Sequence, residues 1–279
     1  MLVTPAWLAE HLHDSNLVLL HVGAKGEFEQ AHIPGAQPLL YSDDISTPHD
    51  MSNGHMAAGT LMLELPPVEQ LKANFEKKGI SDSSRIIVYF GKDWFSPSTR
   101  TILTLTYLGL GDRTSLLDGG IPAWQAAGNP VTSEVKTPAP GHLTPHLHPE
   151  VVVDAAWVSS HLHQPAVAII DARNTQFYTG KSDGGMPRAG HIPGAQSIPF
   201  DSLFGSDGKL KDTATLTEIF RGAGINPGAQ VVSYCHIGQQ ATVIWFAARL
   251  LGLDAHLYDG SWDDWSQRKD LPIEQSEKQ

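Results

Sequence analysis

The only cysteine of this 279-residue chain, Cys235, lies in the segment SYCHIGQQAT at residues 233–242. An apolar run, QVVSY, precedes it and a helix-like run, VIWFAARLLG, follows it, so we expect Cys235 in a loop between a strand and a helix. Unpaired N–H groups and the positive end of the dipole at a helix N-terminus favour the thiolate form of a cysteine. Because the thiolate is the nucleophilic form of cysteine, the segment predicts nucleophilic or sulfur-carrying chemistry.

The loop from Cys235 to Gln240 reads Cys-His-Ile-Gly-Gln-Gln and contains no side chain with a fixed charge. Gly238 permits the backbone angles at which successive N–H groups converge on one point and form a concave anion site. Such a site would stabilise a thiolate, or the persulfide formed from it. The position alone leaves a second interpretation equally open, in which Cys235 is a small buried hydrophobic residue at the end of a strand.

The elements that would position this loop occur twice in the chain. PAWLAEHLHDSNLVLLHVG (5–23) resembles DAAWVSSHLHQPAVAIIDAR (154–173), AHIPGAQPL (31–39) resembles GHIPGAQSI (190–198), and YLGLGDRTSLLDGGIPAW (107–124) resembles LLGLDAHLYDGSWDDW (250–265). Three matches in the same order indicate a duplicated domain. We therefore predict a first domain over residues 1–132, an extended proline-rich linker over 133–149, and a second domain over 150–279.

Each repeat alternates helical and strand patterns, which predicts an α/β fold with a parallel sheet flanked by helices in each domain. In such sheets the reactive crevice lies outside the carboxyl ends of the strands, and Cys235 directly follows a predicted strand there. The corresponding segment of the first repeat, YFGKDWFSPSTR (89–100), contains no cysteine. We therefore expect the second domain to be catalytic and the first domain to be non-catalytic.

The composition is that of a soluble globular protein, with 41% hydrophobic and 18% charged residues. A net charge of −11 argues against a nucleic-acid partner, which would require a basic face. No stretch approaches the roughly 20 apolar residues that span a bilayer, and the N-terminus lacks the pattern of a secretory signal. We expect a cytoplasmic protein without a membrane partner.

The chain resembles the tandem-domain rhodaneses, a family of sulfurtransferases that includes thiosulfate and 3-mercaptopyruvate sulfurtransferases. The resemblance rests on the two HIPGA motifs, the DAR triplet at 171–173, the run MPRAGHIPGA, the six-residue cysteine loop and the stretches DGGIPAW (118–124) and DGSWDDW (259–265). It implies two rhodanese-like domains in tandem, with a persulfide carried by Cys235. It also implies a small-molecule sulfur donor and a thiophilic acceptor such as cyanide, a thiol or a protein thiol, with no metal and no organic cofactor.

The resemblance also assigns residues for donor binding, with departures from the family pattern. The loop residues His236, Ile237, Gly238, Gln239 and Gln240 would surround the donor, and Phe177 stands where the family commonly has an arginine. We expect Arg188, together with a partly protonated His236, to bind the donor anion. The resulting prediction is thiosulfate as the donor, with 3-mercaptopyruvate as the alternative.

Two other functions compete with sulfur transfer. A cysteine-loop phosphatase needs an arginine six positions after the cysteine, and this chain has Ala241 there. A non-catalytic binding module would be expected to have lost the cysteine, which is present. We further predict that Arg173 forms a structural ion pair beneath the loop, and that His32 and His191 of the HIPGA motifs stabilise turns.

Overall fold

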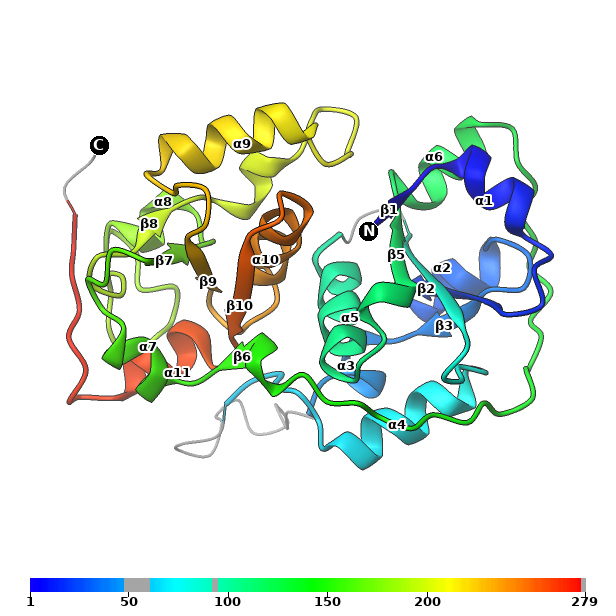
Figure 1. Ribbon diagram of the computed structural model, residues 1–279, viewed down its shortest axis with the longest axis horizontal. Helices are drawn as coiled ribbons and strands as arrows, with labels where there is room; N and C mark the ends of the chain where they lie inside the picture. The colour runs from blue at the N-terminus through cyan, green and yellow to red at the C-terminus, as the bar shows by residue number, and fades with distance from the viewer. Residues whose placement is uncertain (48–60, 92–94, 277–279) are drawn as a thin grey trace. The chain divides into compact units, whose positions relative to one another are not determined.

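The computed structural model describes residues 1–47, 61–91 and 95–276, which form two compact units (Figure 1). Unit 1 contains residues 1–47, 65–148 and 206–210, and unit 2 contains residues 61–64, 149–205 and 211–276. Unit 1 includes the predicted linker as far as residue 148, and two short segments are exchanged between the units. Residues 61–64 belong with the second repeat, and residues 206–210 belong with the first.

Unit 1 is built on a five-stranded parallel sheet in the order β1-β5-β4-β2-β3. Its strands are β1 (Leu2–Val3), β2 (Leu17–Val22), β3 (Gln37–Leu39), β4 (Arg85–Phe90) and β5 (Thr114–Leu117). Its helices are α1 (Pro5–His11), α2 (Lys25–Gln30), α3 (Tyr41–Asp44), α4 (Val68–Lys77), α5 (Phe95–Tyr107), the short 3-10 helix η1 (Gly111–Arg113) and α6 (Gly120–Ala126).

Unit 2 repeats this arrangement in the order β6-β10-β9-β7-β8, again with every pair parallel. Its strands are β6 (Val152–Val153), β7 (Val167–Asp171), β8 (Gln196–Ser197), β9 (Gln230–Tyr234) and β10 (Asp254–Tyr258). Its helices are η2 (Pro149–Val151), α7 (Ala155–Ser160), α8 (Thr175–Tyr178), η3 (Phe200–Leu203), α9 (Thr213–Gly222), α10 (Ala241–Leu250) and α11 (Ser261–Gln267). The predicted duplicated α/β fold is therefore confirmed.

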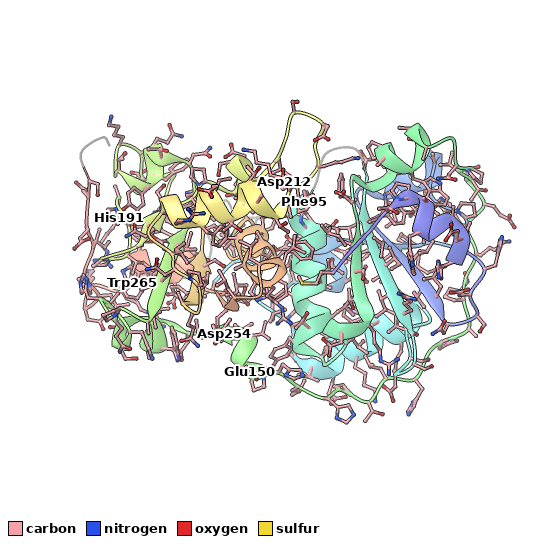
Figure 2. The ribbon with its side chains drawn as sticks, turned by 45° about the horizontal axis from the view of Figure 1, so that its top comes forward. Phe95, Glu150, His191, Asp212, Asp254 and Trp265 are labelled. Carbon is pink, nitrogen blue, oxygen red and sulfur yellow. The ribbon has the colours of Figure 1, made fainter. Side chains whose placement is uncertain are left out.

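The central strands are buried because helices cover both faces of each sheet. In unit 1, Leu8 of α1, Phe28 of α2 and Trp124 of α6 form one core with the sheet, and Figure 1 shows α4 and α5 on the opposite side. In unit 2, Trp262 and Trp265 of α11 are fully buried in the equivalent core, where Figure 2 labels Trp265. The aromatic residues that close each repeat are thus core residues.

Short polar residues set where several helices begin. The side chain of Thr4 accepts the N–H of Trp7 at 3.1 Å at the start of α1, and Asp154 accepts the N–H of Trp157 at 2.8 Å at the start of α7. Asp212, labelled in Figure 2, caps α9 in the same way. Side-chain oxygens at these positions satisfy N–H groups that have no partner within the helix.

The predicted linker is extended and lies against unit 1. The side chain of Gln37 donates to the carbonyl of Lys136 at 3.0 Å, and the N–H of Leu143 donates to Glu76 Oε1 at 2.8 Å. Thr132, the residue directly before the linker, pairs with the first HIPGA motif through a two-bond bridge to His32. Residues 133–148 are therefore ordered by hydrogen bonds to the first unit.

The order of the strands places one topological switch point in each unit. In unit 2, β7 and β9 are neighbours, but the chain continues from β7 to β8 on one side and from β9 to β10 on the other. Ligands of open α/β sheets bind in the crevice where successive connections diverge in this way. In unit 2 that crevice is bordered by Asp171 at the end of β7 and by Cys235 directly after β9.

Candidate active site

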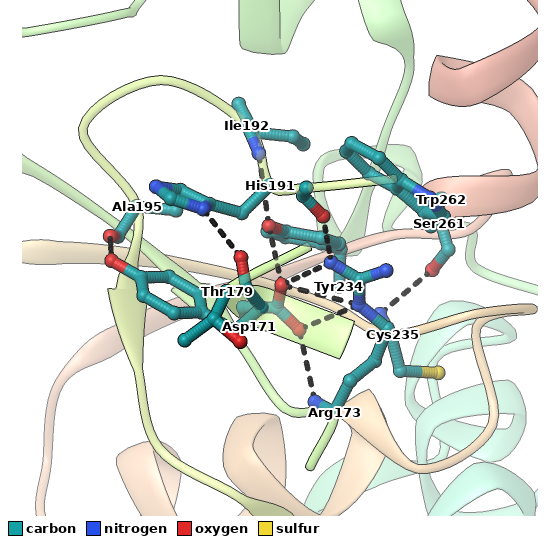
Figure 3. Close-up of polar contacts among 12 residues, drawn as sticks. Asp171, Arg173, Thr179, His191, Ile192, Ala195, Tyr234, Cys235, Ser261 and Trp262 are labelled. Carbon is teal, nitrogen blue, oxygen red and sulfur yellow. Dashed lines mark hydrogen bonds and ion pairs between the residues drawn. The ribbon is translucent and has the colours of Figure 1, made fainter. Parts of the chain in front are cut away.

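Cys235 is a free cysteine at the carboxyl end of β9, and its side chain is 1% exposed. Figure 3 shows its sulfur atom on the side of the loop away from the Asp171–Arg173 pair. The residues before it, from Gln230 to Tyr234, form a strand that pairs with both β7 and β10. The pairing with strands on both sides therefore fixes the backbone as far as Tyr234. The loop begins at Cys235 itself.

The start of α11 holds the carbonyl groups of the cysteine loop. The N–H of Trp262 donates to the carbonyl of Cys235 at 3.0 Å, and the N–H of Asp263 donates to the carbonyl of His236 at 2.9 Å. Because the C=O and N–H of one peptide unit point in opposite directions, these bonds turn the N–H groups of His236 and Ile237 away from α11. The loop donors are therefore oriented by α11, a helix that begins 21 residues after the loop ends at Gln240.

The N–H groups of the loop are available to an anion. Within the part of the chain that the structure describes, four of them have no acceptor in the protein, those of His236, Ile237, Gln239 and Gln240. Gly238 has a φ of 73°, a left-handed conformation that glycine adopts readily, and this reverses the direction of the loop between the two donor pairs. An alternation of this kind is the geometry of an anion-binding nest.

Helix α10 begins directly after the loop and adds the positive end of its dipole. Gln240 precedes its first residue and makes no side-chain capping bond. The helix is ten residues long, and eight of its side chains, from Ala241 to Ala248, are buried. Its position is therefore fixed by the core, and both it and the nest favour negative charge on the loop.

A buried ion pair lies beneath the loop. Asp171 and Arg173 are 0% and 1% exposed, and Arg173 Nη2 lies 2.6 Å from Asp171 Oδ2 (Figure 3). The hydroxyl of Tyr234 donates to the same oxygen at 2.7 Å, and Arg173 also donates to the carbonyl of Gly190. Burial alone would lower the pKa of Arg173, but the charge and hydrogen bonds of Asp171 outweigh it and raise that pKa. The predicted structural ion pair is confirmed.

The surroundings of His236 oppose the partial protonation expected for it. Burial, and then the charge of Arg173, lower the pKa of His236 from 6.5 to about 4. The ring meets Phe177 edge to face, with centroids 4.6 Å apart, and its Nε2 is buried without a hydrogen-bond partner in the described chain. The imidazole therefore carries no positive charge at pH values of about 6 to 7.5. The lowered pKa of His236 could not be predicted from the sequence, because the sequence does not show that the ring is buried.

The guanidinium of Arg188, which we expected to bind the donor anion, is hydrogen-bonded to main-chain carbonyl groups. It donates to the carbonyls of Trp265, Ser266, Arg268 and Leu271, four main-chain oxygens at the C-terminal end of α11. A cation at this end of a helix satisfies orphan carbonyl groups and opposes the negative end of the dipole. These contacts occupy the guanidinium of Arg188 without a ligand, and substitution of Arg188 distinguishes this structural role from the donor-binding role predicted from the sequence.

The two HIPGA histidines have structural partners. His32 Nδ1 lies 2.7 Å from the carbonyl of Phe28, and His191 Nδ1 lies 2.7 Å from the carbonyl of Tyr178. Each ring also stacks on the aromatic side chain of the residue whose carbonyl it contacts. Since the copy without a thiol has the same arrangement, the turn-stabilising role predicted for both histidines is confirmed.

The structure thus brings the predicted loop residues together with Cys235 and adds residues that sequence reasoning missed. Ser261 is the principal addition, because its Oγ accepts the N–H of Cys235 at 3.1 Å (Figure 3). Its only signal in the sequence is the difference between DGS at 259–261 and DGG at 118–120. Among the described residues, no group of three or more His, Cys, Asp or Glu side chains is arranged to hold a metal ion.

Comparison with known proteins gives one family and several full-length relatives. The rhodanese-like domain matches residues 4–127 and again residues 154–268. The chain is 30% identical over 281 residues to the 3-mercaptopyruvate sulfurtransferase of Escherichia coli K12, covering 96% of this chain and 95% of the relative. It is 28% identical over 277 residues to the thiosulfate sulfurtransferase of Azotobacter vinelandii, covering 98% and 97%.

Two further likenesses extend over the whole chain. The sulfur carrier protein TtuD of Thermus thermophilus is 28% identical over 293 residues, covering 100% of this chain and 98% of the relative. The crystal structure of YnjE superposes with a TM-score of 0.83 at 25% identity, covering 99% of this chain and 68% of that chain. Within the described residues, none of the helices combines the length and apolar character that crossing a bilayer requires.

Proposed function

The chain belongs to the family of rhodanese-like domains, which it carries twice, and we propose that it transfers sulfane sulfur from thiosulfate through a persulfide on Cys235. It is a sulfurtransferase of this family, with relatives of both the thiosulfate and the 3-mercaptopyruvate type. The observation that carries the proposal is the nest of unpaired N–H groups around Cys235, in the crevice at the switch point of the second sheet.

The first half of the reaction loads the cysteine. The thiolate of Cys235 attacks the outer sulfur of thiosulfate, a new S–S bond forms, and the original S–S bond of thiosulfate breaks. Sulfite leaves with the electron pair of that bond, and the cysteine becomes a persulfide anion. The loop N–H groups stabilise the negative charge on the outer sulfur, and they require no reorganisation because α11 already orients them.

The second half of the reaction unloads the cysteine. Cyanide attacks the outer sulfur of the persulfide and leaves as thiocyanate, while the electron pair of the broken bond returns to Cys235 as a thiolate. A small thiol or a protein thiol can take the place of cyanide, and the relative named as a sulfur carrier protein supports a protein acceptor. No metal or organic cofactor enters either half of the reaction as proposed.

Thiosulfate is favoured as the donor by the uncharged character of the site. A nest binds a compact oxyanion without a guanidinium fork, whereas a carboxylate and its neighbouring carbonyl oxygen are best fixed by paired arginines. Arg173 and Arg188 are occupied by Asp171 and by main-chain carbonyls respectively. The Escherichia coli relative makes 3-mercaptopyruvate the second candidate donor.

The test is mass spectrometry of the intact protein after incubation with thiosulfate, followed by addition of cyanide. We expect a gain of one sulfur atom on wild type, its loss with cyanide, and no gain on Cys235→Ser, since the chain has no other cysteine. Absence of the gain on wild type would favour a non-catalytic binding module. Steady-state rates with thiosulfate and with 3-mercaptopyruvate, compared side by side, decide between the two donors.

A further inference from the structure

Ser261, the first residue of α11, has a backbone conformation that a residue with a side chain rarely adopts. Its φ is 51°, in the left-handed region, and its side chain is fully buried. Only two other described residues that are not glycine have a positive φ, Leu63 and His163. A Cβ in this conformation crowds the following carbonyl oxygen, so the conformation costs free energy that glycine would avoid.

The first repeat has an equivalent position with which Ser261 can be compared. Gly120 of unit 1 occupies the same place in DGGIPAW as Ser261 does in DGSWDDW, and it has a φ of 56°. A Cβ built on Gly120 would lie 2.7 Å from the carbonyl oxygen of Phe90 and 2.8 Å from its ring. Phe90 follows Tyr89 as Cys235 follows Tyr234, so unit 1 has a bulky ring where unit 2 has the thiol. Unit 1 therefore requires glycine, whereas unit 2 has serine at a strained position where glycine would also fit.

The hydroxyl of Ser261 makes two hydrogen bonds in its buried position. Its Oγ donates to the carbonyl of Tyr258 at 2.9 Å and accepts the N–H of Cys235 at 3.1 Å. The bond to the carbonyl uses the single hydroxyl hydrogen, so the oxygen lone pairs face the cysteine. The N–H and C=O of Cys235 are thus both bonded to the start of α11, the N–H to Ser261 and the C=O to Trp262.

We propose that Ser261 is a positioning residue that fixes the main chain of Cys235 so that its sulfur points into the nest. This inference rests on the proposed role of Cys235 in sulfur transfer. With its N–H and C=O both anchored, the backbone of the cysteine cannot rotate, and the direction of the Cα–Cβ bond is set. The strained conformation is present in the copy that has the thiol because serine supplies an oxygen that glycine lacks.

The test compares Ser261→Gly and Ser261→Ala with a matched control on the same helix. Both variants remove the hydroxyl, but glycine relieves the strain and alanine keeps it. Ser266→Ala is the control, because Ser266 is also buried on α11 and its Oγ has no hydrogen-bond partner within the described chain. The readouts are the rate of Cys235 alkylation by iodoacetamide, kcat and KM for thiosulfate, and the urea midpoint of unfolding.

We expect both Ser261 variants to be alkylated and loaded with sulfur about three- to tenfold more slowly than wild type, the effect of one lost hydrogen bond. KM for thiosulfate should change less than about twofold, Ser261→Gly should unfold at a higher urea concentration than Ser261→Ala, and Ser266→Ala should keep wild-type rates. Alkylation at the wild-type rate in Ser261→Gly, or a rise in KM with unchanged kcat, would overturn the proposal.

Failure of the proposed function gives a different result from failure of this inference. If wild type takes up no sulfur from either donor, the sulfurtransferase proposal fails, and the alkylation rates still report how Ser261 positions the thiol. If wild type takes up sulfur and both Ser261 variants match it in kcat and in alkylation, the positioning role alone is refuted. The single cysteine makes alkylation specific for this site.

Discussion

Acidification should destabilise unit 1 through His21, the last residue but one of β2. Its side chain is 1% exposed, and both ring nitrogens are buried without a hydrogen-bond partner in the described chain. Burial, and then the charge of His32, lower the pKa of His21 from 6.5 to about 4. The rings of Phe28 and Tyr89 pack against the imidazole of His21 in edge-to-face pairs, with centroids 5.4 and 5.1 Å away.

The sign and size of the effect follow from the two pKa values. Between pH values of about 6.5 and 4 the unfolded chain binds a proton at His21 that the folded chain does not. The free energy of unfolding therefore has its full value above this window and decreases as the pH is lowered through it. Each pH unit within the window costs about 1.4 kcal/mol, so lowering the pH from about 7 to about 5 should cost unit 1 about 2 kcal/mol.

Native-state hydrogen exchange of peptides from β2 and β4 measures this loss. Exchange is preferred to a single unfolding curve, because the chain has two units and an overall midpoint would mix them. The variant His21→Phe should lose about 2 kcal/mol less than wild type over the same pH range, because it has no group to protonate. His13→Gln, at an exposed histidine, should behave as wild type.

The reasoning is refuted if His21→Phe and wild type lose the same protection in β2 and β4 between these pH values. It is also refuted if protection in wild type does not change, since the ring would then accept a proton without cost to the fold.

Three further predictions concern unit 2. Replacing Arg173 by Met leaves the buried carboxylate of Asp171 without its cation and should destabilise unit 2 by about 3–5 kcal/mol in urea unfolding, whereas Asp171→Asn with Arg173→Met should recover much of the loss. A loss below about 1 kcal/mol in the single variant would contradict this account. Replacing Arg188 by Lys removes the planar fork that holds four carbonyls and should lower exchange protection at residues 265–271, with KM for thiosulfate changed less than about twofold. A tenfold higher KM with unchanged protection would instead support the donor-binding role. Because the pKa of His236 is lowered to about 4, KM for thiosulfate should stay constant from about pH 7.5 to 6, and a KM that falls steadily in this range in wild type but not in His236→Ala would show that the ring is protonated there.

Much of the fold was predictable because its signals are local. The apolar runs, the helical patterns and the ordered repeats fix which segments are strands and helices and show that they occur twice. The position of Cys235 between a strand and a helix, and the left-handed conformation of Gly238, follow from residue type over a few positions. The short exchanges between the units, at residues 61–64 and 206–210, were not predictable, because they depend on contacts between distant segments.

The details of the site were decided by tertiary structure, because they depend on which distant groups meet. Arg188 has the sequence of a donor-binding residue, but the end of α11, more than 75 residues later, supplies acceptors for its guanidinium. His236 has the sequence of a titrating residue, but the fold buries its ring against Phe177 and lowers its pKa to about 4. Ser261 differs from its counterpart Gly120 by a hydroxymethyl group, whose oxygen can accept the N–H of Cys235 only because the fold brings α11 against the cysteine loop. Sequence by itself determined the nucleophile and the repeated frame around it, while charge, burial and orientation at the site belong to the folded chain, because pKa values and hydrogen bonds depend on neighbours in space.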